Sequence, residues 1–131
     1  MDAVGSVDGG YNPPHLVFPG MSQAVRCGPF VQVSGQVALG ATGEIVSDDP
    51  YEQALQCFEN IELALSAAGS SLTEVTKLVT YLVNVDHFEA YARAKHARFP
   101  GGAPASTTVV VAELLGPRML MEVEAWAYSG G

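Results

Sequence analysis

Glu122 and Glu124 alternate with apolar residues near the end of the chain, in the stretch Met121-Glu122-Val123-Glu124-Ala125. In a strand, side chains alternate between the two faces, so these carboxylates would share one face, roughly 7 Å apart. Met121, Val123 and Ala125 would then form the opposite, apolar face, which is typical of a core. Burial and a neighbouring like charge both raise the pKa of a carboxyl group. Such a carboxylate could move a proton or activate water; the alternative is a carboxylate bonded to backbone or to a partner subunit.

Five further positions are candidates for binding a small molecule. Ser106 and Thr107 carry hydroxyls that could hydrogen bond to a neutral polar substrate, although threonine is also a common strand residue that packs against its neighbours. Ser34 and Gly35 lie near a strand end, where glycine marks a bulge or a close approach of the backbone. Met21 is a candidate for an apolar wall, and a place in the core is the alternative for such a side chain.

The residue types that hold metals and cofactors do not form a recognisable set. His87 and His96 are nine positions apart and do not have the spacing of metal ligands, and His15 lies near the start of the chain. Cys27 and Cys57 are too few for a zinc site or a disulfide framework. The sequence also contains no glycine-rich phosphate loop and no Ser-His-Asp arrangement. We therefore expect no metal and no cofactor.

Composition and charge narrow the class of protein. The chain has 131 residues, is 48% hydrophobic and carries a formal net charge of -8, which indicates one globular domain. Its six basic residues are scattered, so we expect neither nucleic acid nor an anionic membrane as a partner. No apolar run approaches the roughly 20 residues that span a bilayer, and the start lacks the pattern of a signal peptide. We expect a cytoplasmic protein.

Hydrophobic spacing predicts an α+β fold with the element order ββαβαββ. The elements have short connections from residue 18 onward, and residues 1–15 are rich in Gly, Asp and Pro, so we expect a flexible N-terminal tail at 1–15 and a single domain at 16–131. Pro50 suits a first helical turn, Gly69 a helix end, and Asp86 the cap of a second helix. The expected strands are residues 22–26, 30–37, 76–85, 106–112 and 119–128, and the expected helices follow Asp49 and Asp86.

This element order predicts an oligomer. Two helices cover only one face of a sheet of this size, and the strands at residues 76–85 and 107–111 are apolar on both sides. A single copy would expose an apolar sheet face, and exposed apolar patches of that extent mark protein contacts. We expect a homo-oligomer.

These residues together resemble the RidA (YjgF/YER057c/UK114) family, whose best-known members hydrolyse enamine and imine intermediates. The resemblance extends from about residue 18 to residue 128 and depends on the order of several short motifs. The motifs are Val33-Ser34-Gly35-Gln36, Thr42-Gly43-Glu44-Ile45-Val46, Gln53 with Asn60, Ala67-Ala68-Gly69-Ser70-Ser71-Leu72, Val75, Asp86-His87-Phe88, Pro104-Ala105, and Glu122-Val123-Glu124-Ala125 followed by Ala127. The resemblance implies a chorismate-mutase-like fold with both helices on one face of a mixed sheet, and a homotrimer with a substrate cleft at each contact between subunits.

Several cleft positions depart from the family pattern. The family has an arginine directly after Pro-Ala, which clamps the substrate carboxylate through paired charged hydrogen bonds, and this chain has Ser106 there. Met21 stands where a tyrosine is expected, and Ala92 where an asparagine is common. The glutamate that orients water or the imine in the family is kept as Glu122, so the resemblance implies that Glu122 is the catalytic residue. Arg118 lies in a longer loop and is either a relocated cation or an exposed turn residue.

The resemblance and its departures lead to one main hypothesis and two alternatives. The main hypothesis is a hydrolase that deaminates or tautomerises a small imine, enamine or related intermediate in the intersubunit cleft. It would serve one pathway and would not be a general deaminase of 2-aminoacrylate. The first alternative is a trimer that binds a metabolite or a partner protein without catalysis. The second, an endoribonuclease or translation inhibitor, fits poorly with the acidic charge.

Overall fold

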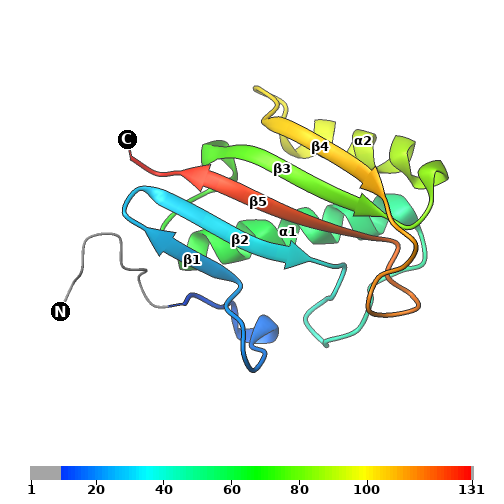
Figure 1. Ribbon diagram of the computed structural model, residues 1–131, viewed down its shortest axis with the longest axis horizontal. Coiled ribbons are helices and arrows are strands. Elements are labelled where there is room, and N and C mark those ends of the chain that lie inside the picture. Colours follow the sequence, from blue (N-terminus) through cyan, green and yellow to red (C-terminus); the bar gives the residue numbers. More distant parts are fainter. Residues whose placement is uncertain (1–9, 131) are drawn as a thin grey trace.

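The computed structural model describes residues 10–130, which form a five-stranded sheet with two helices. The sheet has the strand order β1-β2-β5-β3-β4, and only the neighbours β3 and β4 run parallel (Figure 1). The sheet is therefore mixed, and the predicted element order ββαβαββ is confirmed. The bounds are β1 Ala24–Cys27, β2 Phe30–Gln36, α1 Pro50–Ala67, β3 Val75–Leu82, α2 Phe88–Arg98, β4 Ala105–Val110 and β5 Met121–Tyr128.

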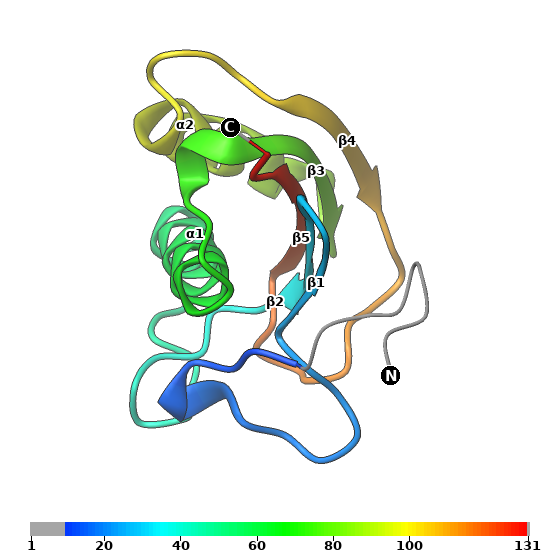
Figure 2. The same cartoon turned by 90° about the vertical axis from the view of Figure 1, so that its left-hand side faces the viewer.

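Both helices pack on one face of the sheet, which curves around them (Figure 2). The core lies between these two layers. From α1 it receives Phe58, Ile61 and Leu65, and from the facing strands it receives side chains such as Val31 and Leu78, all buried. The alternation predicted for the last strand is present, because Met121, Val123, Ala125 and Ala127 are buried under the helices while Glu122 and Glu124 point the other way.

Local sequence accounts for the ends of α1 and for a shifted start of α2. The side chain of Asp49 accepts a hydrogen bond from the backbone N–H of Glu52 at the start of α1, and Gly69, with φ of 81°, follows the end of α1. The prediction that Asp86 caps α2 is wrong. Asn84 accepts a hydrogen bond from the N–H of Asp86 and starts a 3₁₀ turn, so Asp86 lies inside that turn and α2 begins at Phe88.

The N-terminal segment is described from residue 10. Tyr11 pairs with Ala24 of β1, and the side chain of Asn12 accepts a hydrogen bond from the N–H of Gln23. A 3₁₀ turn at Pro14–Leu16 then buries Leu16. Residues 1–9 of the predicted tail lie outside the described residues, and the domain boundary at residue 16 stays a prediction.

Neither α1 nor α2 covers the other face of the sheet, here called the open face (Figure 2). Phe30 is 57% exposed and Tyr128 is 49% exposed, and their rings meet edge to face with centroids 5.2 Å apart. Val109 of β4 is also exposed. The apolar sheet surface expected for a single copy is therefore present. Among residues 10–130, no helix is long and apolar enough to cross a membrane.

Candidate functional site

Glu122 lies half-buried on the open face of β5, directly opposite Tyr81 of β3. Burial, and to a lesser extent the charge of Glu124, raise the pKa of its carboxyl group above the ordinary value. Within the described part of the chain, the Glu122 carboxylate has no hydrogen-bond partner. A partly desolvated carboxyl group without a bonded partner is available to exchange a proton with a bound molecule.

Glu124 has a different environment, although it shares the face with Glu122. The phenol of Tyr81 donates a hydrogen bond of 2.6 Å to Oε1 of Glu124. This bond, followed by burial and the two carboxylates, raises the pKa of Tyr81. The two carboxylates therefore differ. Glu124 is held by the hydrogen bond from Tyr81, whereas Glu122 has no such bond among the described residues and can interact with a bound molecule.

Gly35 of β2 lies directly against the Glu122 side chain. A Cβ atom on residue 35 would overlap the carboxylate of Glu122, and it would lie 2.9 Å from the Cγ atom of Glu122. Only glycine, which has no Cβ atom, leaves room for the Glu122 side chain here. The close approach of the backbone expected at Gly35 is therefore an approach to Glu122, the candidate catalytic residue. The β2–β5 register also shifts between Val33 and Gln36, which places an irregularity of the ladder at this point.

A mostly apolar pocket of about 380 Å³ opens beside Glu122. The pocket is lined by Met21, Leu39 and Met119 among other apolar side chains, with Gly35 and Glu122 on the same wall. A small organic molecule fits a cavity of this size and lining. Met21, predicted as part of an apolar wall, and Gly35 are thus brought together with Glu122, whereas the other proposed binding residues lie elsewhere.

The hydroxyl of Ser34 is used inside the protein. It donates a 2.7 Å hydrogen bond to the backbone carbonyl of Ser22, and the N–H of Ser34 donates to the carbonyl of Gln23. Ser34 therefore fixes the segment that carries Met21 against β2, and it does not line the pocket next to Glu122. The Ser34 side chain thus has a structural role, and the binding role predicted for Ser34 stays a prediction.

Ser106 of β4 lies at the edge of the sheet and is joined to α2 by a hydrogen bond from Lys95, and Ala92 lies three positions before Lys95 on that helix. Ser106 pairs with buried Leu78 and faces the helices, and Glu122 pairs with Tyr81 on the open face. The two residues are three positions apart along the strands and two strands apart, roughly 10 Å in each direction. One copy of the chain does not bring Glu122 and Ser106 into the same site.

Thr107 points to the open face, unlike Ser106. It accepts a 3.0 Å hydrogen bond from the ammonium of Lys77 and is exposed. Thr107 pairs with Val79, which pairs in turn with Glu124, so Thr107 lies two strands away from the carboxylate pair.

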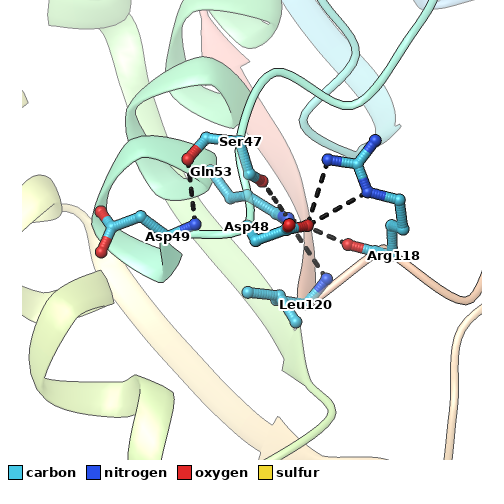
Figure 3. Close-up of polar contacts among 6 residues, drawn as sticks. All are labelled: Ser47, Asp48, Asp49, Gln53, Arg118 and Leu120. Atoms are coloured by element: carbon cyan, nitrogen blue, oxygen red, sulfur yellow. Dashed lines mark hydrogen bonds and ion pairs between the residues drawn. The ribbon is translucent and has the colours of Figure 1, made fainter.

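Arg118 is an ion-pair partner of Asp48, and Figure 3 shows it over the loop before α1. Its guanidinium lies 3.1 Å from the Asp48 carboxylate, and its side chain is half-exposed. This finding favours the exposed turn residue over the relocated cation. Arg26 is also engaged, because it donates to the backbone carbonyls of Gly28 and Ala68.

Gln53, next to this ion pair, joins two loops to the start of β5 (Figure 3). Its amide donates to the carbonyls of Ser47 and Arg118, at 2.8 and 2.9 Å, and its oxygen accepts from the N–H of Leu120 at 3.0 Å. Gln53 is completely buried. These bonds hold the loop that ends at Met119 and therefore one wall of the pocket.

Replacing Gln53 by Leu is expected to destabilise the fold by roughly 3 kcal/mol or more, because it leaves three backbone groups without a partner in a buried place. Urea unfolding followed by circular dichroism measures the change. Gln56→Leu is the matched control, since Gln56 is only partly buried on the same helix. Equal losses in the two variants would contradict the role given to Gln53.

The raised pKa of Glu122 also predicts how stability depends on pH. A carboxyl group whose pKa is higher in the folded than in the unfolded chain binds more protons when folded, so its ionisation costs stability as the pH rises above the unfolded value. Glu122→Gln is therefore expected to be more stable than wild type at neutral pH and to lose this advantage below about pH 4, near the ordinary pKa of glutamate. Thermal melts of the variant and of wild type at neutral pH and below about pH 4 test this. A Glu122→Gln variant less stable than wild type at neutral pH would contradict it.

The described residues contain no group of three or more His, Cys, Asp or Glu side chains placed to hold a metal ion.

Lys95, which sequence reasoning did not select, is the cation that contacts Ser106, at 3.3 Å. The signal for it was its position three residues after Ala92, which places both residues on one face of a helix.

The fold and this site define a small α+β protein. It carries the carboxylate of Glu122, without a hydrogen-bond partner among residues 10–130, on the open face of the sheet, and Ser106 separately at the β4 edge. The family model described as Endoribonuclease L-PSP matches residues 17–129. A solved structure of a YjgF/YER057c/UK114 family member from Mycobacterium tuberculosis has a TM-score of 0.76 and 32% identity, covering 84% of this chain and 87% of that one. The chain belongs to the RidA (YjgF/YER057c/UK114) family.

Two curated relatives add to this assignment. A RutC family protein of Pyrococcus horikoshii is 38% identical over 119 residues, which is 89% of this chain and 92% of the relative. A protein of Dermatophagoides farinae named 2-iminobutanoate/2-iminopropanoate deaminase is 34% identical over 94 residues, 71% of this chain and 73% of the relative.

Proposed function

We propose that this protein hydrolyses a small imine, or its enamine tautomer, in a cleft completed by a second copy of the chain in a homotrimer. The observation that carries the proposal is Glu122: a half-buried carboxyl group with a raised pKa and no bonded partner among residues 10–130, on the wall of a pocket large enough for a small organic molecule. Catalytic carboxyl groups near neutral pH have these properties.

The chemistry needs one water molecule and one group that moves protons. Glu122 takes a proton from water as the water oxygen forms a bond to the imine carbon, and the C=N double bond becomes a C–N single bond. Glu122 then returns the proton to the nitrogen, which gives a carbinolamine. In the second half of the reaction Glu122 carries the proton of the carbinolamine hydroxyl to the nitrogen, the C–N bond breaks, the carbonyl forms and ammonia leaves. The balance is one imine and one water in, one carbonyl compound and one ammonia out, with no redox change.

The separation of the two groups supports a shared site. Glu122, Gly35 and Met21 lie on one side of the chain, and Ser106 and Ala92 lie at the β4–α2 edge, so a second copy has to bring its edge to the pocket of the first. The exposed aromatic pair Phe30 and Tyr128 on the open face provides apolar area for such contacts. A head-to-tail contact of this kind closes into a ring.

The relatives and the departures bear on the substrate. The deaminase name of the Dermatophagoides farinae relative supports an imine as the substrate class. The changes at Met21, Ala92 and Ser106 support a substrate of one pathway over a general 2-aminoacrylate activity. The endoribonuclease description of the family is not matched by a basic surface, because the net charge is -8.

The test is hydrolysis of freshly generated imines. An amino acid oxidase makes α-imino acids and an amine oxidase makes imines without a carboxylate, and semicarbazide traps whatever survives. We expect the protein to lower the trapped amount of at least one class. Hydrolysis of neither class, with binding of a carbonyl product retained, would support the non-catalytic alternative.

Replacing Gly35 by Ala is expected to lower kcat/KM by about 10²-fold, because a misplacement of about 1 Å at a catalytic group has that effect. The new methyl group displaces the Glu122 carboxylate. Gly101→Ala is the matched control, since a Cβ there meets open space. The melting temperature of both variants shows whether the fold is kept. Normal turnover by a folded Gly35→Ala variant would show that Glu122 takes no part in the reaction.

A further inference from the structure

Exposed apolar side chains gather around the mouth of the pocket beside Glu122. Phe18 is 40% exposed, Met21 is 44% exposed and Leu115 is 100% exposed, and all three line this pocket. Phe18 and Met21 come from the segment before β1, whereas Leu115 comes from the loop between β4 and β5. We call these three residues the apolar rim. Two segments that are far apart in the sequence therefore surround one opening with apolar surface.

The inside of the pocket continues the apolar character of the rim. Among the described residues that line it, Glu122 has the only charged side chain. The other polar side chains are those of Gln23 and Gln36, which are buried and joined to each other by a 2.6 Å hydrogen bond. Met21 stands where the family pattern has a tyrosine, so this chain also lacks a hydroxyl at the mouth. The pocket therefore suits a group without polar atoms.

Both sides of the rim are tied to the rest of the fold. Ser34 of β2 bonds to the backbone directly after Met21. On the other side, Gln53 holds the loop at its return to β5. Within that loop the N–H of Gly116 donates to Sδ of Met119 at 3.2 Å, and a Cβ atom on residue 116 would lie 3.0 Å from Cε of Met119. These contacts give the rim a defined position beside the pocket.

The second copy that the proposed function requires does not fill this space by itself. The edge that it brings to the pocket carries Ala92 and Ser106, and both side chains are short. An apolar space of about 380 Å³ left without contents would forfeit the dispersion contacts of its walls. Leu115 would also remain exposed, although burial of a leucine is favourable. An apolar part of a bound molecule meets both conditions.

We propose that the apolar rim and the pocket behind it bind a bulky apolar substituent of the substrate, so that the protein selects imines with larger aliphatic groups over the smallest ones. This inference rests on the proposed function, because Glu122 on the pocket wall then acts on the imine carbon next to that substituent. Each CH₂ group moved from water into such a pocket strengthens binding roughly fourfold. The flexible thioether of Met21 adapts to the shape of the group.

The first test uses two neutral ketones as probes and needs no turnover. The chain has four methionines, and labelling their methyl groups with ¹³C gives NMR signals that single Met→Leu variants assign. Titration with 4-methyl-2-pentanone should move the signals of Met21 and Met119, while Met121, which is 0% exposed in the core, should move far less. Acetone lacks most of the apolar part and should bind about tenfold more weakly. Unchanged signals of Met21 and Met119 would overturn the proposal.

The second test measures specificity with a pair of imines from an amino acid oxidase. 2-Iminopropanoate and 2-imino-4-methylpentanoate share their reacting groups and differ only in the apolar substituent. Wild type should favour the larger imine about tenfold in kcat/KM. Leu115→Ser should lower this preference about fivefold, because a polar side chain then faces the substituent. Leu63→Ser is the matched control, since Leu63 is 39% exposed on α1 and does not line the pocket, and it should keep the preference.

The outcomes separate this inference from the proposed function. If wild type hydrolyses neither these imines nor those without a carboxylate, the proposed function is rejected, and the ketone titration still decides what the pocket binds. Equal hydrolysis of the two imines, or a preference that Leu115→Ser leaves unchanged, would overturn the role of the apolar rim. If Leu115→Ser breaks the assembly in native mass spectrometry, Leu115 belongs to a contact between copies, and the proposal is also overturned.

Discussion

Glu122→Gln is expected to lower kcat/KM for imine hydrolysis by about 10²- to 10⁴-fold, the usual contribution of a positioned acid–base group. Glutamine keeps the size of the side chain and fits beside Gly35, but it cannot take a proton from water. The loss should appear in kcat, because the group acts on the reacting atoms. Stopped assays with semicarbazide trapping measure it, and a variant with more than a tenth of wild-type turnover would exclude Glu122 as the proton-transfer residue.

The pH profile gives this prediction a second readout. Because burial and Glu124 raise the pKa of Glu122, wild-type kcat/KM should fall as the pH drops through that raised value, and Glu122→Gln should lack this limb. Glu124→Gln is the control: it removes the like charge and should move the limb to lower pH while turnover remains. Its bond from Tyr81 can be kept by the amide oxygen.

The fold could be predicted from the sequence because its signals are local. Alternation around Glu122 indicates a strand with one buried face, and Pro50 and Gly69 mark the ends of a helix within a few residues. The one wrong cap shows the limit of such signals. Asp86 and Asn84 are both good caps, and their order in the turn depends on how the chain leaves β3, which no short motif records.

The site could be predicted only in part, because its contacts join distant segments. Gly35 and Met21 were expected near a pocket, but their contact with Glu122 needs the β2–β5 pairing. Arg118 forms its ion pair with Asp48, which lies 70 positions away in the sequence, so the sequence alone could not show that this arginine is already paired. The contact between Lys95 and Ser106 likewise joins a helix to a strand, 11 positions apart along the chain.

The shared site makes a prediction about mixtures of two inactive variants. Ala92→Trp fills the β4–α2 edge with a large ring and should abolish most activity, while leaving Glu122 intact. Glu122→Gln has the opposite defect, an intact edge beside an inactive pocket. In a head-to-tail ring, a site that takes its pocket from one variant and its edge from the other is complete.

Co-expression of Glu122→Gln and Ala92→Trp is therefore expected to restore about a quarter of the wild-type activity, because random assembly gives each site the intact pocket and the intact edge with probability about one half each. Glu122→Gln mixed with wild type sets the scale, since about half of those sites should be intact. Native mass spectrometry verifies that mixed rings form. Mixed rings no more active than either parent would show that the two groups of residues do not meet between subunits, whereas recovery requires that one copy supplies Glu122 and its neighbour supplies the edge that holds the substrate.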